Sequence, residues 1–217
     1  MYRKNLGMCQ PFGVTTRGRP PLVSDDTILS AALAAFATSG YEAMSVRALN
    51  AELGLSHETI SKRFGPKLDL FRAAVKFGAS RLAADFDAEM QAAPADDLGR
   101  LRVVVRAFMV AMSRNPVLGE LVHHEGLNES ERAALVADSG LNGRMGEVVA
   151  LLSRLHAAGE IYETQLRDLW FLAQGAIAPM HFQGLSQIFD AVDGPVDPDE
   201  LINRMTAAIM RSMGVQE

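Results

Sequence analysis

Apolar residues recur every three or four positions along almost the whole chain, which is the spacing of a helix with one buried face. The pattern begins after Ser24, where Leu29, Leu33 and Phe36 fall on one face, and it stops at Gly40. The predicted helices cover residues 24–40, 45–53, 56–64, 67–89, 96–115, 117–124, 128–158 with an interruption near Ser139-Gly140, 163–182 and 198–213. No stretch alternates as a strand would, so the sequence predicts an all-α fold.

Capping residues mark the helix boundaries most clearly in the second half of the chain. Asn128 with Glu131 forms a capping box, and Asp197-Pro198-Asp199-Glu200 places a capping Asp before a Pro at the first helical position. A loop is expected over residues 184–196, which contain Gly194-Pro195. The helices on either side of this loop have apolar stripes broad enough to be buried on two sides.

Two short helices joined by a tight turn occupy the stretch SVRALNAELGLSHETISKRFGPK, from Ser45 to Lys67. Ser45 is a natural N-cap, Gly54 supplies the left-handed residue that ends the first helix, and Gly65-Pro66 stops the second. The second helix turns two apolar residues inward and displays polar and basic side chains on its other faces. This arrangement is typical of a helix-turn-helix that binds DNA.

The stretch SVRALNAELGLSHETISKRFGPKLDLF resembles the helix-turn-helix of the TetR family of bacterial transcriptional regulators. The resemblance covers residues 24–75 and is carried by Ser45, the Gly54-Leu55-Ser56 turn, Phe64 and Lys67. It implies a three-helix DNA-binding head and a helical body with a ligand pocket. It also implies a homodimer formed by the last two long helices, and release from DNA when ligand binds.

Two residues depart from the family pattern. Asn50 stands where helix-turn-helix motifs usually place a small Ala, which affects the crossing of the two helices. Ser61 stands where the family commonly has a Tyr that touches the DNA backbone, so one expected contact is missing. With these departures noted, the predicted organisation is a disordered basic arm over residues 1–23, a DNA-binding domain over 24–66 and a ligand-binding and dimerisation domain over 67–217.

The charge distribution agrees with this division. Residues 1–67 hold eight Lys or Arg and five Asp or Glu, a net +3, which leaves −8 for the rest of a chain whose total is −5. A basic head on an acidic body fits a DNA-binding protein. The single cysteine, Cys9, fits a reducing cytosol, and neither a membrane span nor a secretion signal is expected.

The predicted arm contains Arg17-Gly18-Arg19-Pro20, which resembles the core of an AT-hook. Arginine is attracted to the negative potential of a narrow minor groove, and Gly lets the backbone approach closely. Contact of Arg17 and Arg19 with the minor groove is one interpretation, and an arm that is merely solvated is the other.

The start and outer face of the second short helix carry the side chains that can reach base edges. We expect His57, Thr59 and Lys62 in the major groove. Phosphate contacts are expected from Ser45, Arg47, Ser56, Arg63 and Lys67. By resemblance, Ser56, His57, Thr59, Ser61 and Lys62 match the positions that the family uses.

The body has the residues for an apolar ligand cavity, whose existence is implied mainly by the resemblance. The predicted ligand contacts are Phe108, Met112, His123, Trp170, Gln174 and His181, for each of which the alternative is an ordinary place in the core. His123 and His124 are adjacent and point about a hundred degrees apart on a helix, so no metal site is predicted. No catalytic motif and no cofactor are predicted.

The sequence thus predicts a cytoplasmic, ligand-responsive transcriptional regulator, most simply a repressor, that binds a palindromic double-stranded operator as a homodimer. Its effector would be a small, largely apolar molecule. A small-molecule-binding protein of the same fold that has lost specific DNA reading is the alternative. An all-α enzyme that uses the apolar cavity is a more distant one.

Overall fold

The computed structural model describes residues 23–123, 128–129 and 141–216, and within these ranges the chain is helical without any strand. The all-α prediction is therefore confirmed. The helices are α1 (Asp25–Ala43), α2 (Val46–Glu52), α3 (Thr59–Phe64), α4 (Lys67–Met90), α5 (Asp97–Arg114), α6 (Pro116–His123), α8 (Leu141–Ala157), α9 (Leu166–Ala176), α10 (Ala178–His181), α11 (Gln183–Ser186), α12 (Asp190–Asp193) and α13 (Pro198–Ser212), with a 3-10 turn, η1 (Gln187–Phe189), before α12. Most of the predicted arm, with Arg17 and Arg19, and residues 130–140 lie outside the described residues.

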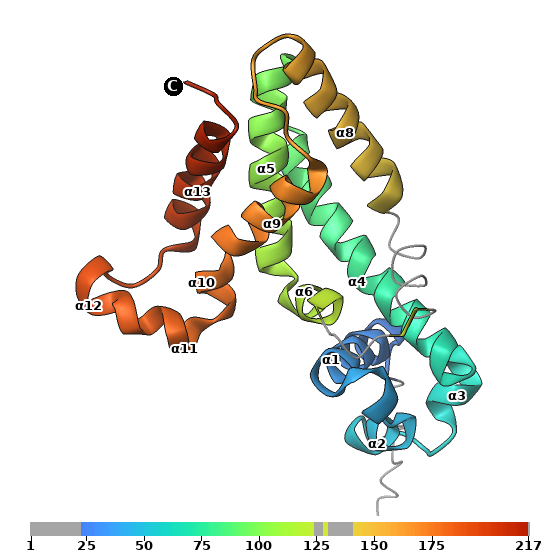
Figure 1. Cartoon of the computed structure of the whole chain (residues 1–217). Helices are drawn as coiled ribbons and strands as arrows, with labels where there is room; N and C mark the ends of the chain where they lie inside the picture. The colour runs from blue at the N-terminus through green and yellow to red at the C-terminus, as the bar shows by residue number, and fades with distance from the viewer. Residues whose placement is uncertain (1–22, 124–127, 130–140, 217) are drawn as a thin grey trace, which may run out of the picture.

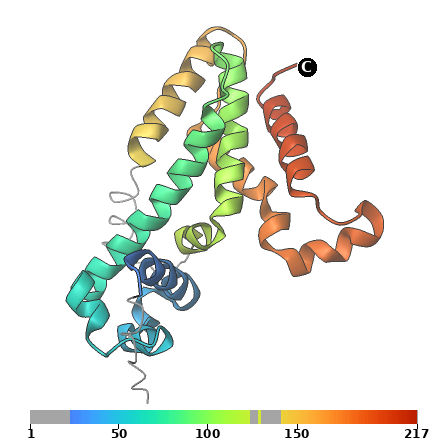
Figure 2. The same ribbon diagram turned by 180° about the vertical axis from the view of Figure 1, so that it is seen from behind.

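Helices α1, α2 and α3 gather at one end of the molecule, and we call them the reading head (Figure 1). In the rest of the chain, α5 is central, because α4, α8, α9 and α13 all pack against it. Helix α6 packs on α1 and so joins the body to the reading head. Helices α10 to α12 leave the bundle as a projecting segment, which then returns to α13 (Figures 1 and 2).

Side-chain caps hold three helix starts, of which the cap at Asp197 was predicted from the sequence. The backbone N–H of Thr27 donates to Ser24 Oγ at 3.1 Å, and that of Gly99 donates to Asp96 Oδ1 at 2.7 Å. At the start of α13, the N–H of Glu200 donates to Asp197 Oδ1 at 2.9 Å. Each carboxylate or hydroxyl satisfies an N–H that the helix leaves without an internal acceptor.

The prediction of one helix over residues 163–182 was wrong. Helix α9 ends at Ala176, Ile177 has ψ near 1°, and α10 begins at Ala178. Pro179 explains the break, because it has no N–H to donate to the carbonyl of Gly175 and its ring crowds that carbonyl. The dimer prediction therefore concerns a shorter helix, α9, than the sequence pattern indicated.

The loop predicted over residues 184–196 is also wrong in part, since α11, η1 and α12 occupy residues 183–193. The missed signal is an apolar series at helical spacing, Leu185, Ile188, Phe189 and Val192. These side chains are exposed, Val192 to 86%. The projecting segment is thus amphipathic and leaves its apolar side chains uncovered.

The first half of α4 belongs to the core of the reading head. Phe71 is fully buried, and its ring lies 5.1 Å from that of Phe36 and 5.3 Å from that of Tyr41. Further along the helix, Gly78 lets α4 approach α1 closely, because a Cβ at this position would lie 2.8 Å from Leu33 Cδ2. Helix α4 is therefore packed into the head before it continues into the body.

Candidate nucleic-acid interface and effector cavity

The turn between α2 and α3 has the geometry that its sequence predicts. The N–H of Ala48 donates to Ser45 Oγ at 3.3 Å, which confirms Ser45 as the N-cap of α2. Gly54 has φ of 66°, and the N–H of Leu55 donates to the carbonyl of Asn50 at 2.8 Å. This is a Schellman ending, in which the residue after the helix needs the left-handed conformation that glycine adopts freely.

Asn50 binds the two helices of the motif together. Its side chain is fully buried, and its Nδ2 donates to the carbonyls of Val46 at 3.0 Å and His57 at 3.1 Å. Its Oδ1 accepts from the N–H of Ile60 at 3.2 Å. A small Ala at this position allows close helix contact, whereas Asn50 fixes the crossing through hydrogen bonds. Sequence reasoning noticed the departure at Asn50 but not this function.

Helix α3 begins at Thr59, three residues later than predicted. The N–H of Thr59 donates to the Ser56 carbonyl at 3.0 Å, and the hydroxyls of Ser56 and Thr59 are 2.7 Å apart, so a separate turn precedes the helix. Ser56 therefore does not cap α3 directly. The side chains of His57, Ser61 and Lys62 are exposed at the turn and along α3. They form a polar surface on the side of α3 away from the head core.

Several predicted DNA contacts already have partners within the protein. Lys62 Nζ lies 2.7 Å from Glu58 Oε2. Arg63 donates to the Val23 carbonyl at 2.8 Å and pairs with Asp25 at 3.2 Å, so it connects α3 to the start of α1.

The Nζ of Lys67 donates to the Glu42 carbonyl at 3.1 Å and lies 4.8 Å from the centre of the Tyr41 ring. Arg47 is on α2, with its side chain toward the surface. The motif thus brings the predicted residues from 45 to 67 to one end of the molecule, with Lys62 and Arg63 held by acidic partners.

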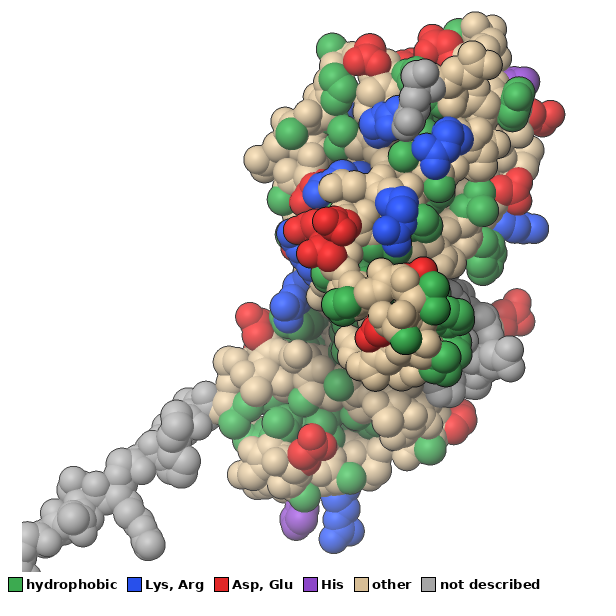
Figure 3. Space-filling view, turned by 90° about the vertical axis from the view of Figure 1, so that its left-hand side faces the viewer, with side chains coloured by type: hydrophobic (Ala, Val, Ile, Leu, Met, Phe, Trp, Pro, Cys, Tyr) green, Lys and Arg blue, Asp and Glu red, His purple; other side chains and the backbone are tan. Residues whose placement is uncertain are grey.

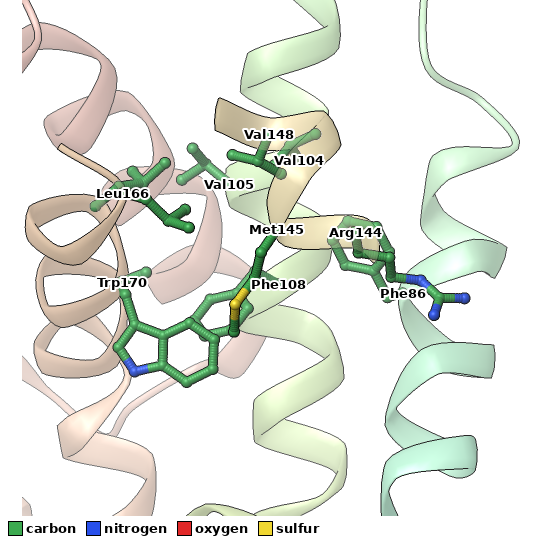
Figure 4. A pocket seen from close by; sticks show the side chains of 11 residues that line it. Phe86, Val104, Val105, Phe108, Arg144, Met145, Val148, Leu166 and Trp170 are labelled. Carbon is green, nitrogen blue, oxygen red and sulfur yellow. The ribbon is translucent and has the colours of Figure 1, made fainter. Parts of the chain in front are cut away.

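A cavity of about 80 Å³ lies in the body, between α4, α5, α8 and α9 (Figure 4). Its walls combine aliphatic and aromatic side chains, and the Phe108 and Trp170 rings approach to 4.6 Å at its edge. The lining residues are Phe86, Val104, Val105, Phe108, Arg144, Met145, Val148, Leu166, Leu169, Trp170 and Ala173. Two predicted ligand contacts, Phe108 and Trp170, therefore meet in one apolar cavity.

The other predicted ligand contacts lie elsewhere. Met112 is buried in the core and does not line the cavity. Gln174 is buried on α9, and among the described residues its Nε2 has no hydrogen-bond acceptor. His181 lines a separate cavity of about 410 Å³ beneath the projecting segment. The side chain of His123, at the end of α6, lies outside the described part of the chain.

Ion pairs join α8 to the two helices that it faces. Arg144 contacts Asp87 of α4 through its Nη2 at 2.6 Å and its Nε at 3.3 Å. Arg154 contacts Asp97 of α5 in the same manner, at 2.7 and 2.9 Å. The hydrogen bonds from Arg154 lower the pKa of the Asp97 carboxyl, and the positive charge of Arg154 adds to this effect. The sequence pattern gave no sign of either pair.

The described part of the chain contains no group of histidine, cysteine or acidic side chains that would hold a metal ion. Within the same residues, no helix is long and apolar enough to cross a membrane.

Comparison with known proteins identifies the reading head. Residues 28–74 match the family model described as bacterial regulatory proteins, tetR family. A comparison with curated proteins found no match.

Solved structures agree with the fold. The TetR-family regulator PfmR from Thermus thermophilus superposes with a TM-score of 0.56 at 22% identity, covering 85% of this chain and 97% of that one. AibR, solved with isovaleryl coenzyme A and operator DNA, gives 0.62 at 18% identity and 83% and 95% coverage. A putative fatty acid metabolism regulator from Clostridium perfringens gives 0.60 at 15% identity and 87% and 99% coverage. The sequence of the reading head thus resembles the tetR family of bacterial regulatory proteins, and the whole chain shares the fold of these solved structures.

Proposed function

We propose that the protein is a transcriptional repressor that binds a palindromic operator as a homodimer and is released by a small, largely apolar effector. One observation carries the proposal: a single helix, α4, takes part in both sites. Its residue Phe71 is buried in the core of the reading head, and its residue Phe86 lines the cavity. Any change in the cavity that moves α4 also moves the head.

For the DNA contacts, the polar surface formed by α3 and the turn before it supports major-groove binding by His57, Thr59 and Lys62, with Ser61 beside them. The starts of α2 and α4, the turn before α3 and the last turn of α3 supply groups for the phosphates. These are Ser45, Arg47, Ser56, Arg63 and Lys67, and Arg17 and Arg19 remain proposed for the minor groove. To bind DNA, Lys62 must leave its ion pair with Glu58 and Arg63 must leave its ion pair with Asp25, so that each can contact a phosphate or a base instead.

The homodimer is proposed to form through the outer faces of α9 and α13. Phe171 and Leu172 of α9 are exposed to 60% and 47%, and exposed large apolar side chains of this kind support an interaction site. The projecting segment extends from the same region, and hydrophobic side chains surround it at the centre of the face in Figure 3. In a two-fold dimer, the same surface of each protomer would cover that of the other.

Effector binding would favour a separation of the two heads that no longer matches the operator. The loss of DNA affinity then equals the difference between the effector affinities of the two states. AibR provides a precedent for a small molecule, isovaleryl coenzyme A, and operator DNA bound to one protein of this fold.

The first experiment is binding of the purified protein to DNA from upstream of its own gene, at two salt concentrations and against scrambled competitor DNA. Tight binding that resists the competitor is expected. His57→Ala and Lys62→Ala should each weaken it without unfolding the protein, while Lys76→Ala, an exposed lysine on α4, should leave it unchanged. Unchanged affinity in both reading-helix variants would refute the proposed interface.

The alternative, a ligand-binding protein that no longer reads DNA, is favoured by one observation. The Glu58–Lys62 ion pair neutralises a cation at the centre of the proposed interface. Weak binding that scrambled DNA removes completely would support this alternative.

A further inference from the structure

One charged residue, Arg144, contributes to the described wall of the cavity. Among its eleven described lining residues Arg144 alone is charged, and the others are apolar. Figure 4 shows its guanidinium group at the edge of the cavity, directed away from Trp170. The Arg144 side chain is 35% exposed, and its apolar stem rather than its guanidinium forms the cavity wall, so the charge reaches a ligand at the cavity edge by rotation of this long side chain.

Arg144 already holds a carboxylate. Two of its nitrogens face the two oxygens of Asp87, the paired geometry in which an arginine binds a carboxylate most strongly. A ligand whose apolar body fills the cavity and whose own carboxylate reaches the cavity edge would compete with Asp87 for the same two nitrogens. An amine at that position would instead be repelled by Arg144, and an alcohol would lack its charge.

The exchange would alter how α8 is held. Helix α8 packs mainly on α5 and α9, and the Arg144–Asp87 pair is its polar link to α4. The neighbouring acids of α4 are engaged with α5, because Glu89 pairs with Arg106 and Asp85 with Arg114. Displacing Asp87 therefore loosens α4 from α8 while α4 stays attached to α5.

We propose that the effector is a small monocarboxylic acid with an apolar body, and that its carboxylate displaces Asp87 from Arg144 and so releases α4 from α8. The proposal rests on the function proposed above and adds to it the chemical class of the effector and the contact that it breaks. The cavity, at about 80 Å³, has roughly half the volume of the engineered cavity of about 150 Å³ that binds benzene. A short aliphatic chain is therefore the body that fits without rearrangement.

The test uses three probes with the same five-carbon chain, namely pentanoate, pentan-1-ol and pentylamine, at neutral pH. Trp170 is the only tryptophan of the chain and lies at the cavity, so its fluorescence reports occupancy directly. Pentanoate should bind about tenfold more tightly than pentanol. This difference in affinity is modest because solvent screens the charge of Arg144 and because Asp87 competes for it. Pentylamine should bind most weakly.

Substitutions distinguish the contribution of the Arg144 charge to ligand affinity from that of the apolar cavity. Arg144→Gln should lower pentanoate affinity to that of pentanol and leave pentanol binding unchanged. Asp87→Asn removes the competitor and should strengthen pentanoate binding severalfold. Arg154→Gln is the matched control, since Arg154 forms a similar paired contact from the same helix but does not line the cavity. It should change none of the three affinities.

The failures are distinguishable. If pentanoate and pentanol bind equally well, or if Arg144→Gln keeps the preference for the acid, the carboxylate proposal is wrong and the apolar cavity stands. If no probe changes the Trp170 emission, the effector cavity itself is refuted, and the carboxylate proposal with it. A fluorescence response combined with absence of operator binding would refute the repressor function but not the acid preference.

Discussion

Replacing Asn50 by alanine tests what fixes the reading head. The change removes the acceptor of the buried Ile60 N–H and the donor to the His57 carbonyl. A buried donor left without a partner costs about 1–3 kcal/mol, and the second lost hydrogen bond costs about 1 kcal/mol. The contact with the Val46 carbonyl lies within α2 and is left out of this count. We expect the free energy of unfolding of the head to fall by about 2–4 kcal/mol.

Amide hydrogen exchange at Ile60 measures this effect locally. A loss of about 2–4 kcal/mol corresponds to exchange that is faster by about thirtyfold to several hundredfold. Asn50→Asp keeps an acceptor for Ile60 but removes the donor to His57, so its exchange should be intermediate. The control is Glu52→Ala, which removes an exposed side chain from the same helix. If the exchange rate of Asn50→Ala stayed within about twofold of this control, the hydrogen bonds of Asn50 would not be what fixes the crossing.

Three further predictions concern charge and assembly. Glu58→Gln should raise operator affinity severalfold and steepen its salt dependence, because Lys62 is then available to phosphates. Phe171→Glu should convert the dimer to monomers in sedimentation experiments, because it places a charge in the proposed interface. The Asp97–Arg154 pair should stabilise the fold above the ordinary pKa of the Asp97 carboxyl and lose its effect as the pH falls through the lowered pKa. The melting temperatures of the wild type and Arg154→Gln should therefore differ at neutral pH and converge at about pH 2.

Each of these predictions has a contrary result. Weaker operator binding by Glu58→Gln would mean that Glu58 itself contacts a base. A Phe171→Glu protein that remains dimeric, as the control Val149→Glu on the exposed side of α8 should, would exclude α9 from the interface. A difference in melting temperature that persists unchanged in acid would show that Arg154 stabilises the fold by packing rather than through Asp97.

The boundaries that could be predicted from the sequence are those set by local chemistry. Asp96 and Asp197 cap α5 and α13 through their own side chains, so the information lies within four residues. Pro179 is also apparent in the sequence, but the apolar spacing on both sides of it favoured one continuous helix. The structure has a break there, because Pro179 lacks the N–H that a continuous helix needs. The division at residues 66 and 67 stays a prediction.

Residues that act across long sequence distances escaped prediction. Arg144 and Asp87 are separated by 57 positions, and no periodicity connects them. The partners of Lys62 and Arg63 were missed for a related reason, because a basic residue near a helix-turn-helix is readily assigned to DNA when its acidic neighbour cannot be placed. Met112 fits the helical spacing of a cavity residue, and only the packing of its helix separates the cavity face from the core face.

The passage of α4 close to α1 has a consequence for protein engineering. Regulators of this architecture invite hybrids in which one DNA-binding unit is exchanged for another. A seam at residue 66 would cut through a continuous apolar core, because Leu70, Phe71 and Val75 of α4 pack in the reading head. A larger residue at position 78 would force the buried Leu33 side chain of α1 to move. In a functional hybrid, the transferred DNA-binding unit should therefore include α4 as far as about Leu82 and keep glycine at position 78. The transferred unit would then contain the part of α4 that connects it to the body.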